Sequence, residues 1–280
     1  MPSPHQAPSR ERHRRLPRNE SREMKAILTV LGSGTSMGVP TIGCNCRVCT
    51  SSDPHDRRTR PSVLVQYDGH TVLIDTTPDF REQAIREKIT RLDAILYTHA
   101  HADHILGLDD VRPLSFKREG KIPLYAHETA ADSLESIFRY IFKADYKFGG
   151  IARVEMNRFN SAVELFGVRF EPVRIVHGEA EIHGFRFGSA AYLTDFSEIP
   201  AESKDRLRGL DILFLDALRH RPHPTHSTVA NSLALVEELQ PRRAFFTHIS
   251  HDLPHQETNM SLPEHVRLAH DGLKLEFDIA

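Results

Sequence analysis

A short run of the sequence, Thr98-His99-Ala100-His101-Ala102-Asp103-His104, concentrates side chains that bind metal ions. Imidazole and carboxylate groups are the usual ligands of zinc, manganese and iron in proteins. The chain has 18 histidines, but the spacing His-x-His-x-Asp-His favours a metal site over a chance surface cluster. Ions held by such ligands generate a hydroxide nucleophile near neutral pH.

The ligand cluster follows residues 93–97, which are apolar and predict a short buried strand. Residues 105–108 resemble a loop that enters a helix. The first two histidines are two positions apart, so in extended backbone they point the same way. The last two ligands require the chain to turn, which divides the four side chains into two pairs. This geometry favours two neighbouring metal ions over one.

A second group of soft ligands is the compact triplet Cys44, Cys46 and Cys49. An odd, clustered set of cysteines is typical of a metal site rather than of a disulfide framework. Structural zinc requires four ligands, so one more must come from elsewhere. His55 is close in sequence and His251 is distant, and the spacing alone leaves both open. A closed zinc site would staple the long loop over residues 41–60.

Further ligand-type residues stand where apolar strands are predicted to end. His177 follows one such segment, Asp195 follows another, and His248 ends the segment that begins at Ala244. Asp75 also ends a predicted strand, beside the strand that carries the main cluster. We expect it either to orient a metal-binding histidine through the far ring nitrogen or to cap a turn.

Strands alternating with helices predict sheets that are covered by helices. Asp68-Gly69 indicates a hairpin turn, and further turns are expected at Phe166-Gly167 and around Gly184. The glycine-rich segment 32–40 is interpreted as an active-site wall loop or a structural turn, since it lacks the ending of a phosphate-binding loop. The expected strands cover 26–31, 62–67, 71–75, 93–97, 124–125, 212–216, 244–248 and 273–278, and the expected helices cover 106–119, 128–142 and 227–239.

Composition sets the remaining limits. The net charge of −2 provides no global basic field for nucleic acid. Residues 1–23 contain six Arg and several Pro but almost nothing apolar, so we expect a basic, disordered tail before one domain over 24–280. Apolar runs fall short of the ~18 residues that span a bilayer. The tail lacks the apolar core of a secretory signal, so we expect a cytoplasmic protein.

The complete ligand set resembles the metallo-β-lactamase fold superfamily, and specifically its phosphodiesterase-like members. The resemblance covers residues 24–280 and implies an α/β fold, an αββα four-layer sandwich of two mixed sheets with helices outside. It implies a dinuclear site of zinc or manganese ions. The first ion would bind His99, His101 and His177, the second would bind Asp103, His104 and His248, and Asp195 would bridge them.

The glycine-rich opening, the cysteine triplet and the segment 247–251 narrow the resemblance. Together they are similar to the phosphoribosyl 1,2-cyclic phosphate phosphodiesterase of the carbon–phosphorus lyase pathway and its relatives. That family implies a structural zinc on the three cysteines and His251. It also implies a histidine that is not a metal ligand and acts as general acid, for which His226 is the best match and His223 the alternative.

The expected function is therefore that of a dinuclear metal-dependent phosphodiesterase. A metal-bridging hydroxide held beside Asp103 would attack a small or cyclic nucleotide-like phosphodiester, and His226 would assist the leaving group. The alternatives are a tRNA 3′-processing endonuclease, or a thioester or lactam hydrolase on the same metal core. Nucleic acid is a less favoured partner than a small substrate, no membrane partner is expected, and a homodimer is allowed for.

Overall fold

The computed structural model describes residues 24–143 and 150–279. The basic tail expected over 1–23 lies outside the described residues. Within the described part of the chain, no helix has the length and apolar character needed to cross a membrane.

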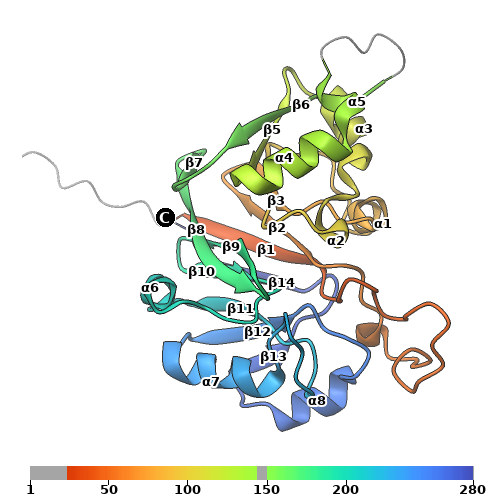
Figure 1. The fold of residues 1–280 in the computed structure, drawn as a ribbon, viewed down its shortest axis with the longest axis vertical. Helices are drawn as coiled ribbons and strands as arrows, with labels where there is room; N and C mark the ends of the chain where they lie inside the picture. The colour runs from red at the N-terminus through yellow and green to blue at the C-terminus, as the bar shows by residue number, and fades with distance from the viewer. Residues whose placement is uncertain (1–23, 144–149, 280) are drawn as a thin grey trace, which may run out of the picture.

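Two mixed seven-stranded sheets form the centre of the fold (Figure 1). The first has the order β14-β1-β2-β3-β4-β5-β6, and the second has the order β13-β12-β11-β10-β9-β8-β7. The strands of the first sheet are β1 Lys25–Gly32, β2 Ser62–Tyr67, β3 His70–Ile74, β4 Ala94–Leu96, β5 Ile122–Ala126, β6 Val154–Arg158 and β14 Lys274–Asp278. Those of the second are β7 Val163–Leu165, β8 Val168–His177, β9 Ala180–Phe187, β10 Ala190–Leu193, β11 Ile212–Asp216, β12 Arg243–Thr247 and β13 Val266–Leu268.

Helices cover the outer face of each sheet (Figure 1). One group packs on the first sheet: α1 Phe80–Arg86, α2 Ala102–Ile105, η2 Leu108–Val111, α3 Arg112–Phe116, α4 Glu128–Ile137 and α5 Arg139–Phe142. The other group lies on the side of the second sheet: α6 Ala201–Lys204, η3 Asp205–Leu207, α7 Val229–Leu239 and α8 His255–Ser261. A short turn of helix, η1 Pro54–Asp56, lies in the loop that Figure 1 colours orange. The layers are those of a metallo-β-lactamase sandwich, as the sequence predicted.

Strand residues are apolar on both faces because both faces are buried. Val63 and Val65 of β2 are fully buried and pack between the sheets, against Phe170 and Phe185 of the second sheet. Leu64, between them in sequence, packs under the helices instead. Side chains alternate between the faces of a strand, so one short apolar segment contributes to two cores. The strands are thereby held rigidly, and the loops at their ends have fixed positions.

Two helices are shorter than the sequence pattern predicted. The helix expected over 106–119 is divided into η2 and α3. Gly107 precedes both and lies so close to Thr77 that a Cβ atom there would be 1.9 Å from the Thr77 carbonyl oxygen. Pro113 then stands at the start of the next helix, where its missing N–H is tolerated. The helix expected over 128–142 is interrupted at Phe138, whose backbone leaves the helical region at φ −98° and ψ 35°.

The turn expected around Gly184 was wrong, because this residue lies inside β9. A Cβ atom at Gly184 would lie 2.7 Å from the carbonyl oxygen of Tyr192 on the neighbouring strand. The glycine therefore permits a close approach of two backbones rather than a reversal of the chain. The turns fall instead on either side of β9, at Gly178 and Gly188, which both have positive φ angles. The hairpin turns at Asp68-Gly69 and Phe166-Gly167 are confirmed.

Candidate metal centre and active site

Strand ends from both sheets meet at one edge of the sandwich and carry the predicted ligands. The segment after β4 bears the main cluster, β8 ends at His177, Asp195 follows β10, and His248 follows β12. Asp195 and His248 have φ angles of 59° and 57°. This left-handed conformation is uncommon for residues other than glycine and is concentrated at functional sites. The backbone therefore turns sharply at Asp195 and at His248, the two ligands that follow strands of the second sheet.

Four side chains form a tight buried group: Asp103, His104, Asp195 and His248. Their ligand atoms all lie within 4.8 Å of one another. Nε2 of His104 is 3.3 Å from an oxygen of each carboxylate. Nε2 of His248 is 3.1 Å from Asp195 and 3.6 Å from Asp103. This arrangement corresponds to the second predicted ion with its bridging carboxylate.

The other three predicted ligands, His99, His101 and His177, form a run of neighbouring rings. The ring centroids of His99 and His101 are 4.6 Å apart, and those of His101 and His177 are 5.0 Å apart. Nε2 of His99 is 4.0 Å from Asp195. All seven predicted ligands thus lie near one another, and Asp195 approaches members of both predicted sets of three: His99 and His177 in one, and His104 and His248 in the other.

The donor atoms have the character that a bound cation requires. Among the described residues, five buried atoms of these ligands have no hydrogen-bond partner: His99 Nε2, Asp103 Oδ2, His104 Nε2, His248 Nε2 and His248 Nδ1. Unpaired buried polar atoms are costly and rare in native proteins. A cluster of imidazole nitrogens and a carboxylate oxygen is the donor set of divalent transition metals. The residues therefore fit the metal that the sequence predicted.

Neighbouring groups orient two of these histidines through the opposite ring nitrogen. Nδ1 of His104 is 2.7 Å from Asp75 Oδ2, and Nδ1 of His177 is 2.8 Å from the carbonyl oxygen of Thr225. Asp75 also accepts hydrogen bonds from the backbone N–H and the hydroxyl of Thr98. Such partners fix the tautomer in which Nε2 is free for a metal. Of the two roles expected for Asp75, the structure shows the orienting one.

His226 lies beside this centre and is held by a residue that the sequence analysis missed. Its Nδ1 is 2.7 Å from Asp216 Oδ2, and its ring stacks on His248 at 4.6 Å. Its ligand atom also lies within 4.8 Å of those of His177 and Asp195, close enough for coordination. Asp216 is fully buried at the end of β11, so its place at a strand end was the signal that could have revealed it.

The alternative general acid, His223, is half-buried in the same loop. Its Nδ1 is 3.3 Å from the backbone nitrogen of Thr225 and 3.2 Å from its hydroxyl. The ring centroid of His223 is 5.0 Å from that of His226. His226 is therefore the nearer of the two histidines to the ligand group.

The cysteine triplet meets His251 and not His55. Nδ1 of His251 lies 3.2 Å from Sγ of Cys44, 3.5 Å from Cys46 and 3.3 Å from Cys49. The backbone N–H of Cys49 donates to the sulfur of Cys46 and lowers the pKa of that thiol to about 6. Three sulfurs and one imidazole fit a closed zinc site. His55 packs instead against the rings of His255 and His270.

The glycine-rich segment supports the backbone that carries His248. Its Thr35 N–H donates to the carbonyl of Ile249, and the Ile249 N–H donates to the carbonyl of Ser33. A Cβ atom at Gly34 would lie 2.7 Å from the carbonyl oxygen of Arg58. These contacts favour the interpretation of residues 32–40 as a wall loop, because the segment packs against the backbone next to the ligand His248.

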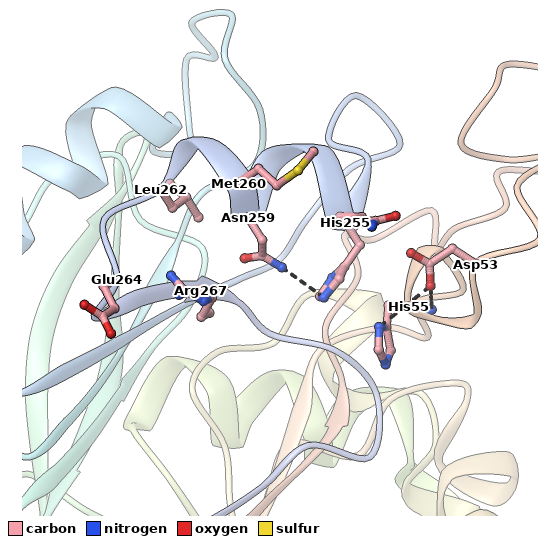
Figure 2. A pocket seen from close by; sticks show the side chains of 9 residues that line it. Asp53, His55, His255, Asn259, Met260, Leu262, Glu264 and Arg267 are labelled. Carbon is pink, nitrogen blue, oxygen red and sulfur yellow. Dashed lines mark hydrogen bonds and ion pairs between the residues drawn. The ribbon is translucent and has the colours of Figure 1, made fainter.

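A surface cavity of about 610 Å³ lies away from the metal centre, beside α8 (Figure 2). His255 and Asn259 meet there, with 3.0 Å between their side-chain nitrogens, and His55 lies next to Asp53. None of the predicted metal ligands lines this cavity. It is therefore separate from the candidate active site.

Comparisons with known proteins agree with this geometry. A family model described as a beta-lactamase superfamily domain matches residues 70–249. A solved structure described as a new diphosphatase from the PhnP family is 66% identical, with a TM-score of 0.87, and the match covers 91% of this chain and 98% of that one. The zinc-bound PqqB of Methylobacterium extorquens is 22% identical, with a TM-score of 0.73 over 89% of this chain and 99% of that one, and so shows the fold alone.

A Porphyromonas gingivalis protein named octanoyltransferase is 39% identical over 91% of this chain. The match covers only 52% of that relative, so the chain spans about half of its length. The activity in its name is therefore that of the longer protein.

Proposed function

This chain belongs to the PhnP family of the β-lactamase superfamily, whose members are metal-dependent hydrolases, and from that membership we propose that it hydrolyses phosphodiester bonds of small molecules. The observation that carries the proposal is the set of buried, unpartnered ligand atoms beside His226. These ligands would hold the two ions of the proposed dinuclear site. His226, whose Nδ1 is held by Asp216, would be the general acid that acts on the leaving alcohol.

Two divalent ions on these ligands would supply Lewis-acid stabilisation of the phosphoryl oxygens and activate water near neutral pH. The residues do the positioning. Asp75 and Thr225 fix the rings of His104 and His177 with Nε2 directed at the centre. Asp216 holds Nδ1 of His226, so Nε2 of that ring is the atom available for a proton transfer to the leaving oxygen. We propose zinc at the three cysteines and His251, where it would staple the loop over 41–60.

A second candidate is hydrolysis of a diphosphate bond. It is favoured by the 66% identical structure, which is described as a diphosphatase. In both reactions water attacks a phosphorus atom, and in both the metal ions would stabilise the negative charge that develops on the phosphoryl oxygens. They differ in the leaving group, which is an alcohol in one case and a phosphate in the other. A phosphate needs less help from an acid, so dependence on His226 separates the two.

The test is a substrate panel with protein refilled with zinc or manganese. It comprises bis(p-nitrophenyl) phosphate, a dinucleoside diphosphate, precursor tRNA, a thioester and a lactam. We expect turnover of the first substrate, and its loss after a chelator removes the metals. Faster turnover of the dinucleoside diphosphate would favour the second candidate. Turnover of the tRNA alone, or of the thioester or lactam alone, would contradict both.

A further inference from the structure

Three histidine rings from distant parts of the chain pack together beside α8. His55 lies in η1, His255 begins α8, and His270 stands between β13 and β14. The ring centroid of His55 is 4.6 Å from that of His255 and 4.1 Å from that of His270, and the latter two are 5.7 Å apart. His55 and His255 also line the cavity beside α8, which gives water access to the rings (Figure 2). This histidine cluster joins the loop over 41–60 to two segments from the second half of the chain.

The ring of His255 is held in a form that accepts a hydrogen bond at Nε2. The side-chain oxygen of Asn259 accepts from the backbone N–H of Leu268 at 2.8 Å, so its amide nitrogen faces the ring, 3.0 Å from Nε2 of His255. An amide nitrogen only donates, so Nε2 accepts and Nδ1 carries the ring hydrogen. Nδ1 is buried and has no hydrogen-bond partner among the described residues. A proton added at Nε2 would therefore set one donor against another.

Little negative charge surrounds the rings. Asp53 has an oxygen 3.7 Å from Nδ1 of His55 and, among the described residues, pairs with neither Lys nor Arg. The other nearby carboxylates are already engaged, in the pairs Asp56–Arg58 and Asp271–Arg86. Glu264 and Arg267 lie at the other end of the cavity (Figure 2). One carboxylate does not balance three imidazolium ions, so protons added to these rings would repel one another at close range.

The packing keeps the rings neutral. Burial, together with the neighbouring His55, Arg58 and His270, lowers the pKa of His255 to about 4. Burial also lowers the pKa of His270. An exposed imidazole has a pKa of about 6.5, so a form in which the rings separate takes up protons before the packed form does. The packed form is therefore fully stable above about pH 6.5 and loses stability as the pH falls towards about 4.

We propose that the histidine cluster is a pH-sensitive latch, which holds the loop over 41–60 closed while its rings are neutral and releases the loop when they take up protons. The proposal goes beyond the proposed function and does not depend on it. It depends on the packing of three rings from three segments, on the fixed amide of Asn259 and on the shortage of carboxylates.

Release of this loop would reach both metal sites. The loop carries the cysteine triplet, and the buried guanidinium of Arg58 donates to the carbonyl of Ser250, next to His251. The backbone of Arg58 also pairs with that of Val39 in the glycine-rich segment. Acidification would therefore loosen the cysteine loop together with the wall that packs beside His248.

The test is hydrogen exchange, measured by mass spectrometry on the full metal-loaded chain at about pH 7.5 and about pH 5 and corrected for the intrinsic effect of pH. The readout is the protection of peptides that cover residues 41–60. A pKa of about 4 in the closed form and about 6.5 in the open form favours opening about 30-fold more at the lower pH. We expect protection of the loop to fall by about that factor, while the hairpin of β2 and β3 keeps its protection.

Two variants remove the titration. His255→Gln keeps an acceptor for Asn259 but takes up no proton, so the fall in protection should be about tenfold smaller. His270→Phe keeps a flat ring without a charge and should reduce the fall in the same direction. His265→Gln is the matched control, because His265 is exposed and lies outside the cluster. It should show the fall of the wild type.

Equal loss of protection in the loop and in the hairpin of β2 and β3 would overturn the proposal. A fall of wild-type size in both His255→Gln and His270→Phe would also overturn it. Acid release of zinc from the cysteines alone would persist in both variants and would give that second result.

Discussion

Replacement of Asp75 by Asn should weaken the metal centre while the fold survives. Asp75 is fully buried, and its carboxylate oxygens accept from Thr98 N at 2.9 Å, from Thr98 Oγ1 at 2.8 Å and from His104 Nδ1 at 2.7 Å. Asn has the same shape and tolerates the φ of 66° at this position. Its amide nitrogen is a donor, however, so in either orientation it faces a donor of Thr98 or His104. One orienting hydrogen bond is lost.

Loss of such a partner typically costs 10- to 100-fold in metal affinity or activity, about 1.4 to 2.8 kcal/mol. The measurement is the dissociation constant of the metal, obtained by competition with a chromophoric chelator, together with kcat/KM. Asp93→Asn is the matched control, because Asp93 is also buried and accepts from the backbone of Thr71 at 2.9 Å. It should lower stability but not metal affinity. The reasoning fails if Asp75→Asn binds metal within twofold of the wild type, or if Asp93→Asn weakens binding equally.

Three further predictions follow from the remaining contacts. His226→Ala should reduce kcat toward a phosphodiester with an unactivated alkyl alcohol as leaving group by about 100-fold or more while metal content, measured by emission spectroscopy, stays the same; a lost equivalent of metal would make His226 a ligand instead. Cys46→Ser should remove one equivalent of zinc and lower the melting temperature, and equal zinc content in variant and wild type would contradict the proposed site. Arg58→Met should reduce the free energy of unfolding by about 3–5 kcal/mol. The buried guanidinium of Arg58 donates hydrogen bonds to the carbonyls of Ser250 and Leu253 and to Asp56. An unchanged urea midpoint of unfolding would show that these bonds contribute little.

The positions of many strands were predictable from the sequence because these strands are short apolar segments, several of them with a polar residue at the end. The ends of β4, β10 and β12 carry ligand types that local spacing reveals. Helix boundaries were harder, since periodicity records neither the change from η2 to α3 at Arg112 nor the dihedral angles of Phe138 that end α4.

The sequence spacing around the cysteines also could not decide whether His251 or His55 is their fourth partner. His251 stands 207 residues from Cys44, so only the folded chain shows that they meet. Asp216 was missed for a similar reason, because its partner His226 approaches from a loop. Sequence reasoning could place residues at strand ends, but the pairing of those ends is a tertiary property.

The position of β14 has a consequence for how the chain is made. This strand pairs antiparallel with β1, from Lys25 opposite Asp278 to Thr29 opposite Lys274. All of the second sheet lies between them in sequence. A ribosome therefore releases β1 long before its outer neighbour exists, and the growing chain presents an open strand edge of the kind that invites wrong pairing. Residues 274–278 close that edge only after every strand of the second sheet has emerged, so the first sheet becomes complete after the second.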